Sequence, residues 1–374
     1  MCSSNKEGGI RMFVPHVSEE AIARVADTLR SGWIGEGPVV KAFEEKFKEI
    51  IGTPYPVAVN SGTSALSLAV VMAGVKCGDE VITTAQTMMA TSHVIIAQQA
   101  KPVFADIQYM MGNIDPNDIE HRISEKTKAI LVVQWGGYPC DIDEIHEIAA
   151  KYRLPVIEDA AHALGAQYKG KPIGSISPFT CFSFQAIKHI TTGDGGMLCL
   201  LDKDRYEEAK RRRWYGIDRE RRKPSILGEA EWNVKENGYK YHMNDIAGSL
   251  GLEHIKEVKG ILSRRATIAN RYRKELRNIT GIRLFENKED RFSANWLFSI
   301  HVERREDFAR AMKERGVEVS VVHLRIDTND VFGGIRNDLP ELERFTATHI
   351  SIPVHDRLTD EDVDYVIKSI KKGW

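Results

Sequence analysis

Short apolar runs alternate with amphipathic helical stretches over the first two thirds of the chain. The runs, between residues 55 and 201, are YPVAV, DEVITT, KPVFADI, KAILVVQW, LPVIED, TCFSF and GGMLCLL. Runs rich in Val, Ile and Leu, separated by helices such as IDEIHEIAAKY, are typical of parallel strands that are buried on both faces. The pattern therefore predicts an α/β domain with a mostly parallel, seven-stranded sheet over residues 1–260.

The helical stretches indicate where elements begin and how the chain continues. In VSEEAIARVADTLRSG, Ser18 is a predicted N-cap, and Ile22 and Leu29 share one apolar face. The stretch ILSRRATIANRYRKEL predicts a helix, residues 261–276, that leads out of the first domain. Beyond it, NWLFSIHV, REDFARAMKERG, VEVSVV and TDEDVDYVIKSIKK predict a smaller α+β domain, so that residues 261–374 form the second domain.

Charge and composition narrow the classes of function. With 52 basic and 53 acidic side chains, the net charge of -1 gives no general attraction to nucleic acid or to anionic membranes. The first residues lack a signal-peptide core, and no segment approaches the roughly 18 apolar residues of a membrane span. Five scattered cysteines without a CxxC pair predict free thiols. We expect a cytoplasmic protein without a metal, and neither nucleic acid nor a membrane as partner.

The stretch VAVNSGTSALSLAVVMAG predicts a strand, a turn of small residues and a helix that begins near Thr63 or Ser64. Backbone N–H groups and hydroxyls at such a helix N-terminus can hold a phosphate. An ordinary N-cap beside a glycine turn explains the same residues equally well. The stretch lacks the lysine of a Walker loop, so that kind of nucleotide site is excluded.

Two further strand ends carry polar residues. Glu158 and Asp159 close an apolar run, where burying a carboxylate is costly unless a positive or protonated group meets it. An N-cap role for Asp159 and a structural role for His162 remain alternatives. Ser183 and Lys188 follow the next run, and the apolar neighbours of Lys188 favour a neutral, nucleophilic amine over a solvated surface charge. A phosphate seat, a strand-end aspartate and a half-buried lysine are together the parts of a pyridoxal phosphate (PLP) site.

Ordered stretches along most of the chain support this interpretation. They include SGWIGEGPVVKAFEEKF, AVNSGTSAL, GDEVITT, VIEDAAHALGAQYKGKPIGS, CFSFQAIKHITTGDGGM and GYKYHMNDIAGSLGL. In these stretches the chain resembles the DegT/DnrJ/StrS family, which are sugar aminotransferases of the fold type I PLP enzymes. The resemblance implies that Lys188 forms the Schiff base with the cofactor and that Asp159 partners the pyridine nitrogen. The residues implied to surround the rest of the cofactor are Gly62, Thr63 and Ser183 at the phosphate and His162 beside the ring.

Three stretches depart from the pattern of the family. Met88 stands where relatives usually have an aromatic residue that stacks on the cofactor ring, and a thioether offers a different face. Lys240 stands where asparagine is common, in a stretch implied to reach the phosphate of the neighbouring subunit in a homodimer with shared active sites. The stretch SVVHLRIDTNDVF replaces a segment that helps form the sugar pocket in many relatives.

The residues that we predict to bind substrate follow from the same stretches. Trp33, His323 and Arg325 come from stretches implied to lie near the sugar, and Arg219 comes from the basic run KRRRWYGIDRERRK. That run is either a solvated helix face and loop or a clamp for a diphosphate or carboxylate. Binding of nucleic acid by this run is disfavoured, because the run has neither an aromatic platform nor an extended basic face beside it.

The resemblance implies transamination in two half-reactions. L-Glutamate would donate its amino group, and a keto sugar would accept it, with a nucleotide-linked 4-keto-6-deoxy (or 3-keto) hexose as the expected acceptor. The product would be an amino sugar for a surface polysaccharide, such as lipopolysaccharide O-antigen, or for a glycosylated metabolite. One branch of the family has histidine in place of the lysine and performs dehydration, so Lys188 favours transamination. The alternatives are a free keto sugar, sugar acid or cyclitol as acceptor, and a regulatory or sensory protein that binds ligand without turnover.

Overall fold

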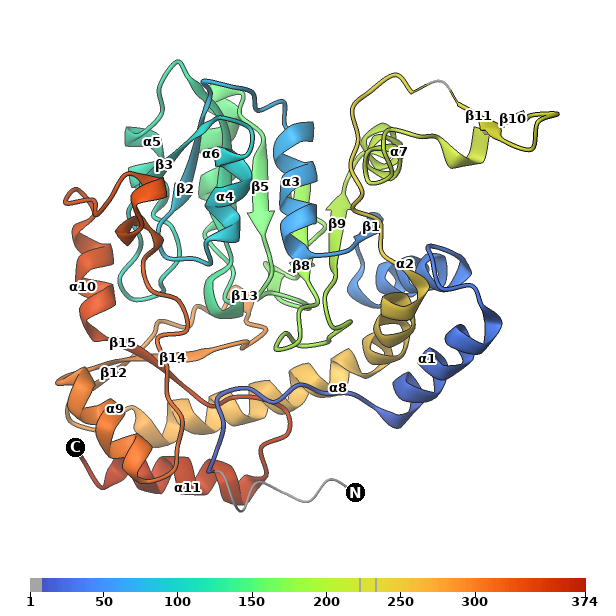
Figure 1. The fold of residues 1–374 in the computed structure, drawn as a ribbon. Helices are drawn as coiled ribbons and strands as arrows, with labels where there is room; N and C mark the ends of the chain where they lie inside the picture. The colour runs from blue at the N-terminus through green and yellow to red at the C-terminus, as the bar shows by residue number, and fades with distance from the viewer. Residues whose placement is uncertain (1–8, 222, 233) are drawn as a thin grey trace.

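A seven-stranded sheet forms the centre of the molecule, in a computed structural model that describes residues 9–221, 223–232 and 234–374 (Figure 1). Its strands lie in the order β1-β9-β8-β5-β4-β2-β3. Their bounds are β1 (Tyr55–Val59), β2 (Glu80–Thr84), β3 (Lys101–Ala105), β4 (Thr127–Val133), β5 (Val156–Asp159), β8 (Phe179–Ser183) and β9 (Gly196–Leu200). Of these seven, β9 runs antiparallel to both of its neighbours and the other six share one direction. The mostly parallel sheet of an α/β fold is confirmed, and each of the predicted runs supplies one strand.

Helices cover both faces of this sheet, and their apolar side chains form two separate cores with the strands. One face carries α3 (Gly62–Met72), α4 (Ala90–Ile96) and α7 (Lys203–Arg212); the other carries α2 (Pro38–Ile51), α5 (Pro116–His121), α6 (Ile142–Tyr152) and the first half of α8 (Asp245–Leu276). Because both faces of the strands are buried, the strands appear in the sequence as continuous apolar runs rather than as alternating patterns.

The N-terminal helix α1 (Glu19–Ser31) packs against α8. Its N-cap is the predicted Ser18, whose hydroxyl accepts a hydrogen bond from the Ala21 N–H. The apolar pair Ile22 and Leu29 does not enter the core, because these side chains are 51% and 52% exposed. The helix instead turns Ala21 and Thr28 inward, so the apolar stripe of α1 is left on the surface of the chain.

Helix α8 joins the large unit to the small one (Figure 1). Val258 belongs to the core of the large unit and Tyr272 to the core of the small unit. The predicted boundary at residue 260 therefore falls inside one continuous helix. Ile10 lies in the small-unit core and bridges Val317, so the small unit also takes up residues near the start of the chain.

The small unit is built on an antiparallel sheet with strand order β12-β14-β15. Its elements are β12 (Ile282–Leu284), β14 (Phe298–Val302), α9 (Arg305–Glu314), α10 (Pro340–Thr348), β15 (His349–Ile352) and α11 (Asp360–Lys371). The stretch VEVSVV forms isolated bridges at Val317 and Ser320 instead of a continuous strand. The observed architecture is the α+β arrangement that the sequence predicts for this part of the chain.

Five short strands lie outside these two sheets. They are β6 (Gln167–Tyr168), β7 (Lys171–Pro172), β10 (Lys223–Pro224), β11 (Ala230–Glu231) and β13 (Arg291–Phe292). The hairpin of β10 and β11 projects away from the body of the molecule (Figure 1). Among the residues described, no helix combines the length and apolar character needed to cross a membrane.

Candidate active site

A cavity of about 290 Å³ lies at the carboxyl ends of β5 and β8 and at the first turn of α3. Ligands bind at this edge in open α/β sheets. Trp296 and His323, from the last third of the chain, line its other side. The predicted site residues that line the cavity are Gly62, Thr63, Met88, Asp159, His162, Ser183, Lys188 and His323. The fold thus brings together residues that are far apart in the sequence.

Lys188 lies in the tight turn that follows β8. The Lys188 N–H donates to the Gln185 carbonyl oxygen at 2.9 Å, and Lys188 lines the cavity. Its Nζ atom lies 3.8 Å from the centroid of the Trp296 ring. Burial lowers the pKa of Lys188 to about 7, while the charge of Asp159 acts in the opposite direction. A large share of the amine is therefore neutral, and so nucleophilic, at neutral pH.

Asp159 is the last residue of β5 and is buried. Thr91 Oγ1 donates to Oδ2 at 2.7 Å and the Ala161 N–H donates to Oδ1 at 3.2 Å, which fixes the plane of the carboxylate. Burial raises its pKa, and these two hydrogen bonds oppose the rise. The preceding Glu158 lines no part of this cavity and instead accepts a hydrogen bond from Gln134. A cationic group beside Asp159 would offset the cost of burying its charge.

The turn before α3 forms a seat for an anion. Ser61 is the N-cap, and its hydroxyl accepts the Ser64 N–H at 3.0 Å. The Gly62 and Thr63 N–H groups belong to the first turn, where a helix offers no carbonyl partner, and both residues line the cavity. A Cβ atom on Gly62 would lie 2.8 Å from the Cβ of Ser183, so only glycine permits this close approach of α3 to β8.

His162 follows Asp159 and lies flat against Trp296, with ring centroids 3.8 Å apart and an interplanar angle of 15°. Burial lowers the pKa of His162 well below its ordinary value, and the charge of Lys188 lowers it further. The imidazole is therefore neutral. In the part of the chain that the structure describes, its buried Nδ1 has no hydrogen-bond partner. This leaves a polar atom at the cavity wall for a ligand to satisfy.

Comparison with known proteins decides the family. Residues 15–371 match the model described as the DegT/DnrJ/EryC1/StrS aminotransferase family. The chain belongs to this family. It is 33% identical, over 96% of each chain, to the UDP-4-amino-4-deoxy-L-arabinose--oxoglutarate aminotransferase of Shewanella sediminis. The structure resembles sugar aminotransferase CalS13 from Micromonospora echinospora, with a TM-score of 0.93, 36% identity and coverage of 98% of this chain and 100% of that one.

A second solved structure bears on the cofactor. The PLP-form of Spr1654 from Streptococcus pneumoniae matches with a TM-score of 0.90 and 32% identity, covering 97% of this chain and 98% of that one. The chain is accordingly a PLP-dependent sugar aminotransferase of fold type I, as the sequence predicts.

The cavity of this aminotransferase fits PLP. When bound, PLP supplies an aldehyde that condenses with an amine and a protonated ring that accepts an electron pair. Lys188 offers the amine, and Asp159 offers a buried carboxylate for the ring N–H. The first turn of α3 and Ser183 offer donors for a phosphate, and the unpartnered Nδ1 of His162 offers one further polar contact.

Three residues in or beside the cavity were not predicted from the sequence. Thr91 orients Asp159, Trp296 contacts Lys188, and Gln185 lines the cavity beside them. The sequence signal for Thr91 was its place just after the TTAQTMM turn at a strand end. For Trp296 there was no local signal, because its contacts with His162, Ile187 and Lys188 are made across more than a hundred residues of sequence. Met88 lines the cavity as predicted and is 48% exposed, so its thioether borders open space.

Four predicted residues lie outside the cavity of their own chain, namely Trp33, Arg219, Lys240 and Arg325. Trp33 and Arg219 border a separate hollow of about 540 Å³, and Arg219 pairs with Glu36 at 2.9 Å. Lys240 Nζ lies 4.2 Å from the centroid of the Trp214 ring. The structure therefore separates these residues from Lys188 within one chain.

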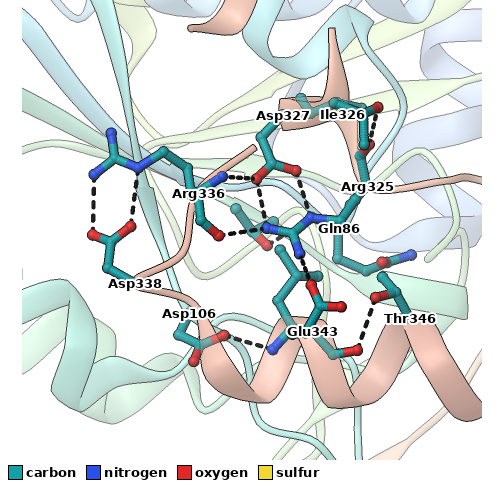
Figure 2. A network of polar contacts seen from close by, with 12 residues as sticks. Gln86, Asp106, Arg325, Ile326, Asp327, Arg336, Asp338, Glu343 and Thr346 are labelled. Carbon is teal, nitrogen blue, oxygen red and sulfur yellow. Dashed lines mark hydrogen bonds and ion pairs between the residues drawn. The ribbon is translucent and has the colours of Figure 1, made fainter. Parts of the chain in front are cut away.

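Arg325 does not line the cavity and is held in an ion-pair network (Figure 2). Its Nε and Nη2 atoms donate to the two carboxylate oxygens of Asp327 at 2.7 and 2.6 Å. Its Nη1 donates to Glu343 at 2.5 Å, and Nη2 also reaches the Arg336 carbonyl oxygen at 2.9 Å. These contacts use the donors of the guanidinium. Through Glu343 they connect α10 to the loop that carries His323 and Arg325. A structural role accounts for Arg325 better than the substrate contact that the sequence suggested.

Covalent attachment of PLP to the apoprotein is expected to accelerate as the pH rises through about 7 and to level off above it. Protonated Lys188 cannot attack an aldehyde, and burial lowers its pKa to about 7, so each pH unit below that value should slow attachment about tenfold. Stopped-flow absorbance between about pH 5.5 and 9 would measure the profile. A rate that keeps rising toward the ordinary lysine value of 10.5 would contradict the effect of burial.

Proposed function

We propose that this aminotransferase moves the amino group of L-glutamate to a nucleotide-linked keto sugar, a 4-keto-6-deoxy or 3-keto hexose. The observation that carries the proposal is the meeting of Lys188, Asp159 and the first turn of α3 around one cavity. The Shewanella relative supports the donor and the nucleotide, because its name specifies oxoglutarate and a UDP-linked amino sugar. The product is then an amino sugar for a polysaccharide such as lipopolysaccharide O-antigen.

Each residue of the cavity has a role in this proposal. Lys188 holds the cofactor through Nζ until an incoming amine displaces Lys188. The freed Nζ then takes a proton from the donor carbon and later delivers one to the sugar carbon. Asp159 keeps the proton on the ring nitrogen. The Gly62 and Thr63 N–H groups and the Ser183 hydroxyl bind the phosphate. His162 stays neutral beside the ring and donates or accepts one hydrogen bond through Nδ1.

His323 is the substrate-binding residue in this proposal. It lines the cavity, its ring lies 5.8 Å from that of His162, and its buried Nε2 has no partner within the residues described. Burial lowers the pKa of His323 to about 4, so a neutral imidazole faces the substrate and suits a sugar hydroxyl rather than a carboxylate.

The enzyme forms a homodimer in this proposal, and the projecting hairpin supports it. Ile226 and Leu227 at its tip are 102% and 83% exposed, which is unfavourable for apolar side chains that stay in water. A partner subunit would bury them and would bring Lys240, Trp33 and Arg219 toward a neighbouring cavity. A cytoplasmic location agrees with the cysteines of the described residues, which are free thiols.

The double substitution of Ile226 and Leu227 by glutamate is expected to weaken the dimer by at least about a hundredfold, because two charges would have to be buried at the interface. Sedimentation equilibrium of the variant and the wild type over a range of concentrations measures the change. A matched control is Ile335→Glu, an exposed apolar residue on a different unit of the chain. A wild-type protein that sediments as a monomer would contradict the proposed dimer.

The test of the function takes the two half-reactions in turn. The protein is loaded with PLP and mixed with L-glutamate, and 2-oxoglutarate and the loss of the PLP absorption band are measured. The aminated enzyme is then offered dTDP- and UDP-linked 4-keto-6-deoxy and 3-keto hexoses, with free keto sugars and keto cyclitols alongside. Release of 2-oxoglutarate followed by amination of a nucleotide-linked sugar supports the proposal. Amination of only the free acceptors would overturn the nucleotide-linked part, and an unchanged PLP band with every amino donor would indicate a protein that binds without turnover.

A further inference from the structure

Trp296 is a fully buried ring whose position is fixed from several sides. Its indole N–H donates to the Ile187 carbonyl oxygen at 3.0 Å. Its ring stacks on His162 at 3.8 Å and on Phe13 at 5.2 Å between centroids. A side chain with its polar atom bonded and its ring stacked in this way has little freedom to move. The ring therefore presents a fixed π surface to the cavity.

Lys188 meets this surface. Its Nζ lies 3.8 Å from the ring centroid, within the distance at which an ammonium is attracted to an indole. Among the described residues, no oxygen atom is hydrogen-bonded to Nζ. The Asp159 carboxylate, whose charge acts on Lys188, accepts hydrogen bonds from Thr91 and Ala161 instead. The indole ring is thus the specific contact of the amine.

The charges that face Lys188 come from four segments. Asp159, at the end of β5, attracts the ammonium. His162, His189 and His323 are held neutral because burial lowers the pKa of each. Asp194 lines the same cavity from the turn before β9. Within the described residues none of the three imidazoles is hydrogen-bonded to the amine: the rings of His162 and His323 are stacked 5.8 Å apart, and His189 Nε2 contacts the Ala294 carbonyl oxygen at 2.9 Å.

We propose that Trp296 is a positioning residue for Lys188. The Lys188 ammonium lies against the face of the Trp296 ring whenever this lysine is not joined to a carbonyl group. Burial destabilises the charged form of the amine, and attraction to the indole face offsets part of this destabilisation. The ring thereby keeps a buried lysine able to hold a proton. A lysine with no such contact would be charged in a smaller share of molecules and would hold the proton it has taken up less firmly.

The consequence for catalysis rests on the proposed function. In that function Lys188 takes a proton from one carbon and delivers it to another, so the ammonium must persist between the two steps. The Trp296 face holds the ammonium at a fixed point beside the cavity during this interval. The amine then need not find its position again before it returns the proton.

The test measures the protonation of Lys188 directly in the apoprotein, before any PLP is added. Protein labelled with ¹³C at the lysine Cε is titrated by NMR, and the Lys188→Ala variant identifies the signal. In Trp296→Leu the midpoint of the Lys188 titration is expected to fall by about one pH unit, because the cation–π attraction is lost. In Trp296→Phe, which keeps a weaker π face, the midpoint should fall by less.

Phe13→Leu is the matched control. Phe13 stacks on Trp296, and this substitution loosens the same cluster while it leaves the indole in place. The titration of Lys188 should stay at the wild-type midpoint in this control. A shift in Phe13→Leu as large as that in Trp296→Leu would overturn the proposal, because packing alone would then explain it. An unchanged or higher midpoint in Trp296→Leu would overturn it as well.

A second measurement avoids the risk that a substitution at a buried tryptophan prevents folding. Growth on 5-fluorotryptophan replaces all 6 tryptophans with a ring of nearly the same shape and a weaker negative face. The Lys188 midpoint should fall in the fluorinated protein, and an unchanged midpoint would contradict the proposal. Failure of the proposed function would show separately, since a protein that does not turn over L-glutamate would still show the Lys188 titration and its dependence on Trp296.

Discussion

Replacement of Lys188 by alanine is expected to abolish transamination, with a fall in turnover of at least about 10³-fold, and to remove the absorption band of covalently held PLP. General acid–base catalysis alone contributes a factor of about 10² to 10⁴ to the rate. The loss of the covalent link adds to it. Turnover of L-glutamate and the visible spectrum of the PLP-loaded protein measure the two effects.

Among the described residues that line the cavity, no second lysine is present to replace this amine. His189 is adjacent in the sequence, but its Nε2 contacts the Ala294 carbonyl oxygen at 2.9 Å and the residue is buried away from the cavity lining. Burial also lowers the pKa of His189 well below its ordinary value. The histidine of the dehydratase branch therefore has no counterpart here, and dehydration is not expected to replace the lost transamination.

Lys169→Ala provides the control for Lys188→Ala. Lys169 is half-exposed and pairs with Asp143 at 2.6 Å outside the cavity. Loss of such a surface pair has little effect on stability and none on the site, so turnover should match the wild type. Turnover by Lys188→Ala within about tenfold of the wild type would remove Lys188 from the chemistry. The cavity would then need a different base.

Much of the fold could be predicted because strands that are buried on both faces appear in the sequence as continuous apolar runs. Strands such as β4 and β5 appear as unbroken apolar runs, and their carboxyl ends must meet at one edge, which placed Asp159 near Lys188. The direction of β9 could not be predicted, because an apolar run looks the same in either orientation. The strand-end pattern alone does not distinguish Glu158 from Asp159, although the family resemblance singles out Asp159. Strand geometry separates them, since successive side chains point to opposite faces.

The contacts made across long stretches of sequence were the least predictable. Trp296 reaches Lys188 from the segment before β14, and no local pattern indicates that an indole there meets a lysine. The sequence predicts Arg325 as a substrate ligand, because this arginine belongs to a stretch implied to lie near the sugar. Its partners Asp327 and Glu343 take up the guanidinium instead (Figure 2). The arrangement depends on how α10 packs, which the residue types alone do not determine.

Replacement of Asp159 by asparagine is expected to lower turnover by about 10³-fold while PLP still binds. Asparagine keeps the shape of the side chain and can still accept from Thr91, but it carries no charge to hold the proton on the ring nitrogen. Two unit charges about 4 Å apart in a partly buried site interact by about 4 kcal/mol, which corresponds to about a thousandfold. Asp159→Ala, which also leaves Thr91 without its acceptor, should weaken PLP binding in addition.

Glu158→Gln is the control that separates this effect from the burial of a charge in general. Glu158 is as deeply buried as Asp159 and adjacent to it, but it lies with Gln134 outside the cavity. Because burial raises the pKa of Glu158, the neutral amide should be tolerated, and turnover should stay within about threefold of the wild type. PLP affinity and the rate of the L-glutamate half-reaction are measured for both variants. Equal losses in Glu158→Gln and Asp159→Asn would mean that the buried polar network as a whole, rather than the carboxylate at the cavity, sets the rate.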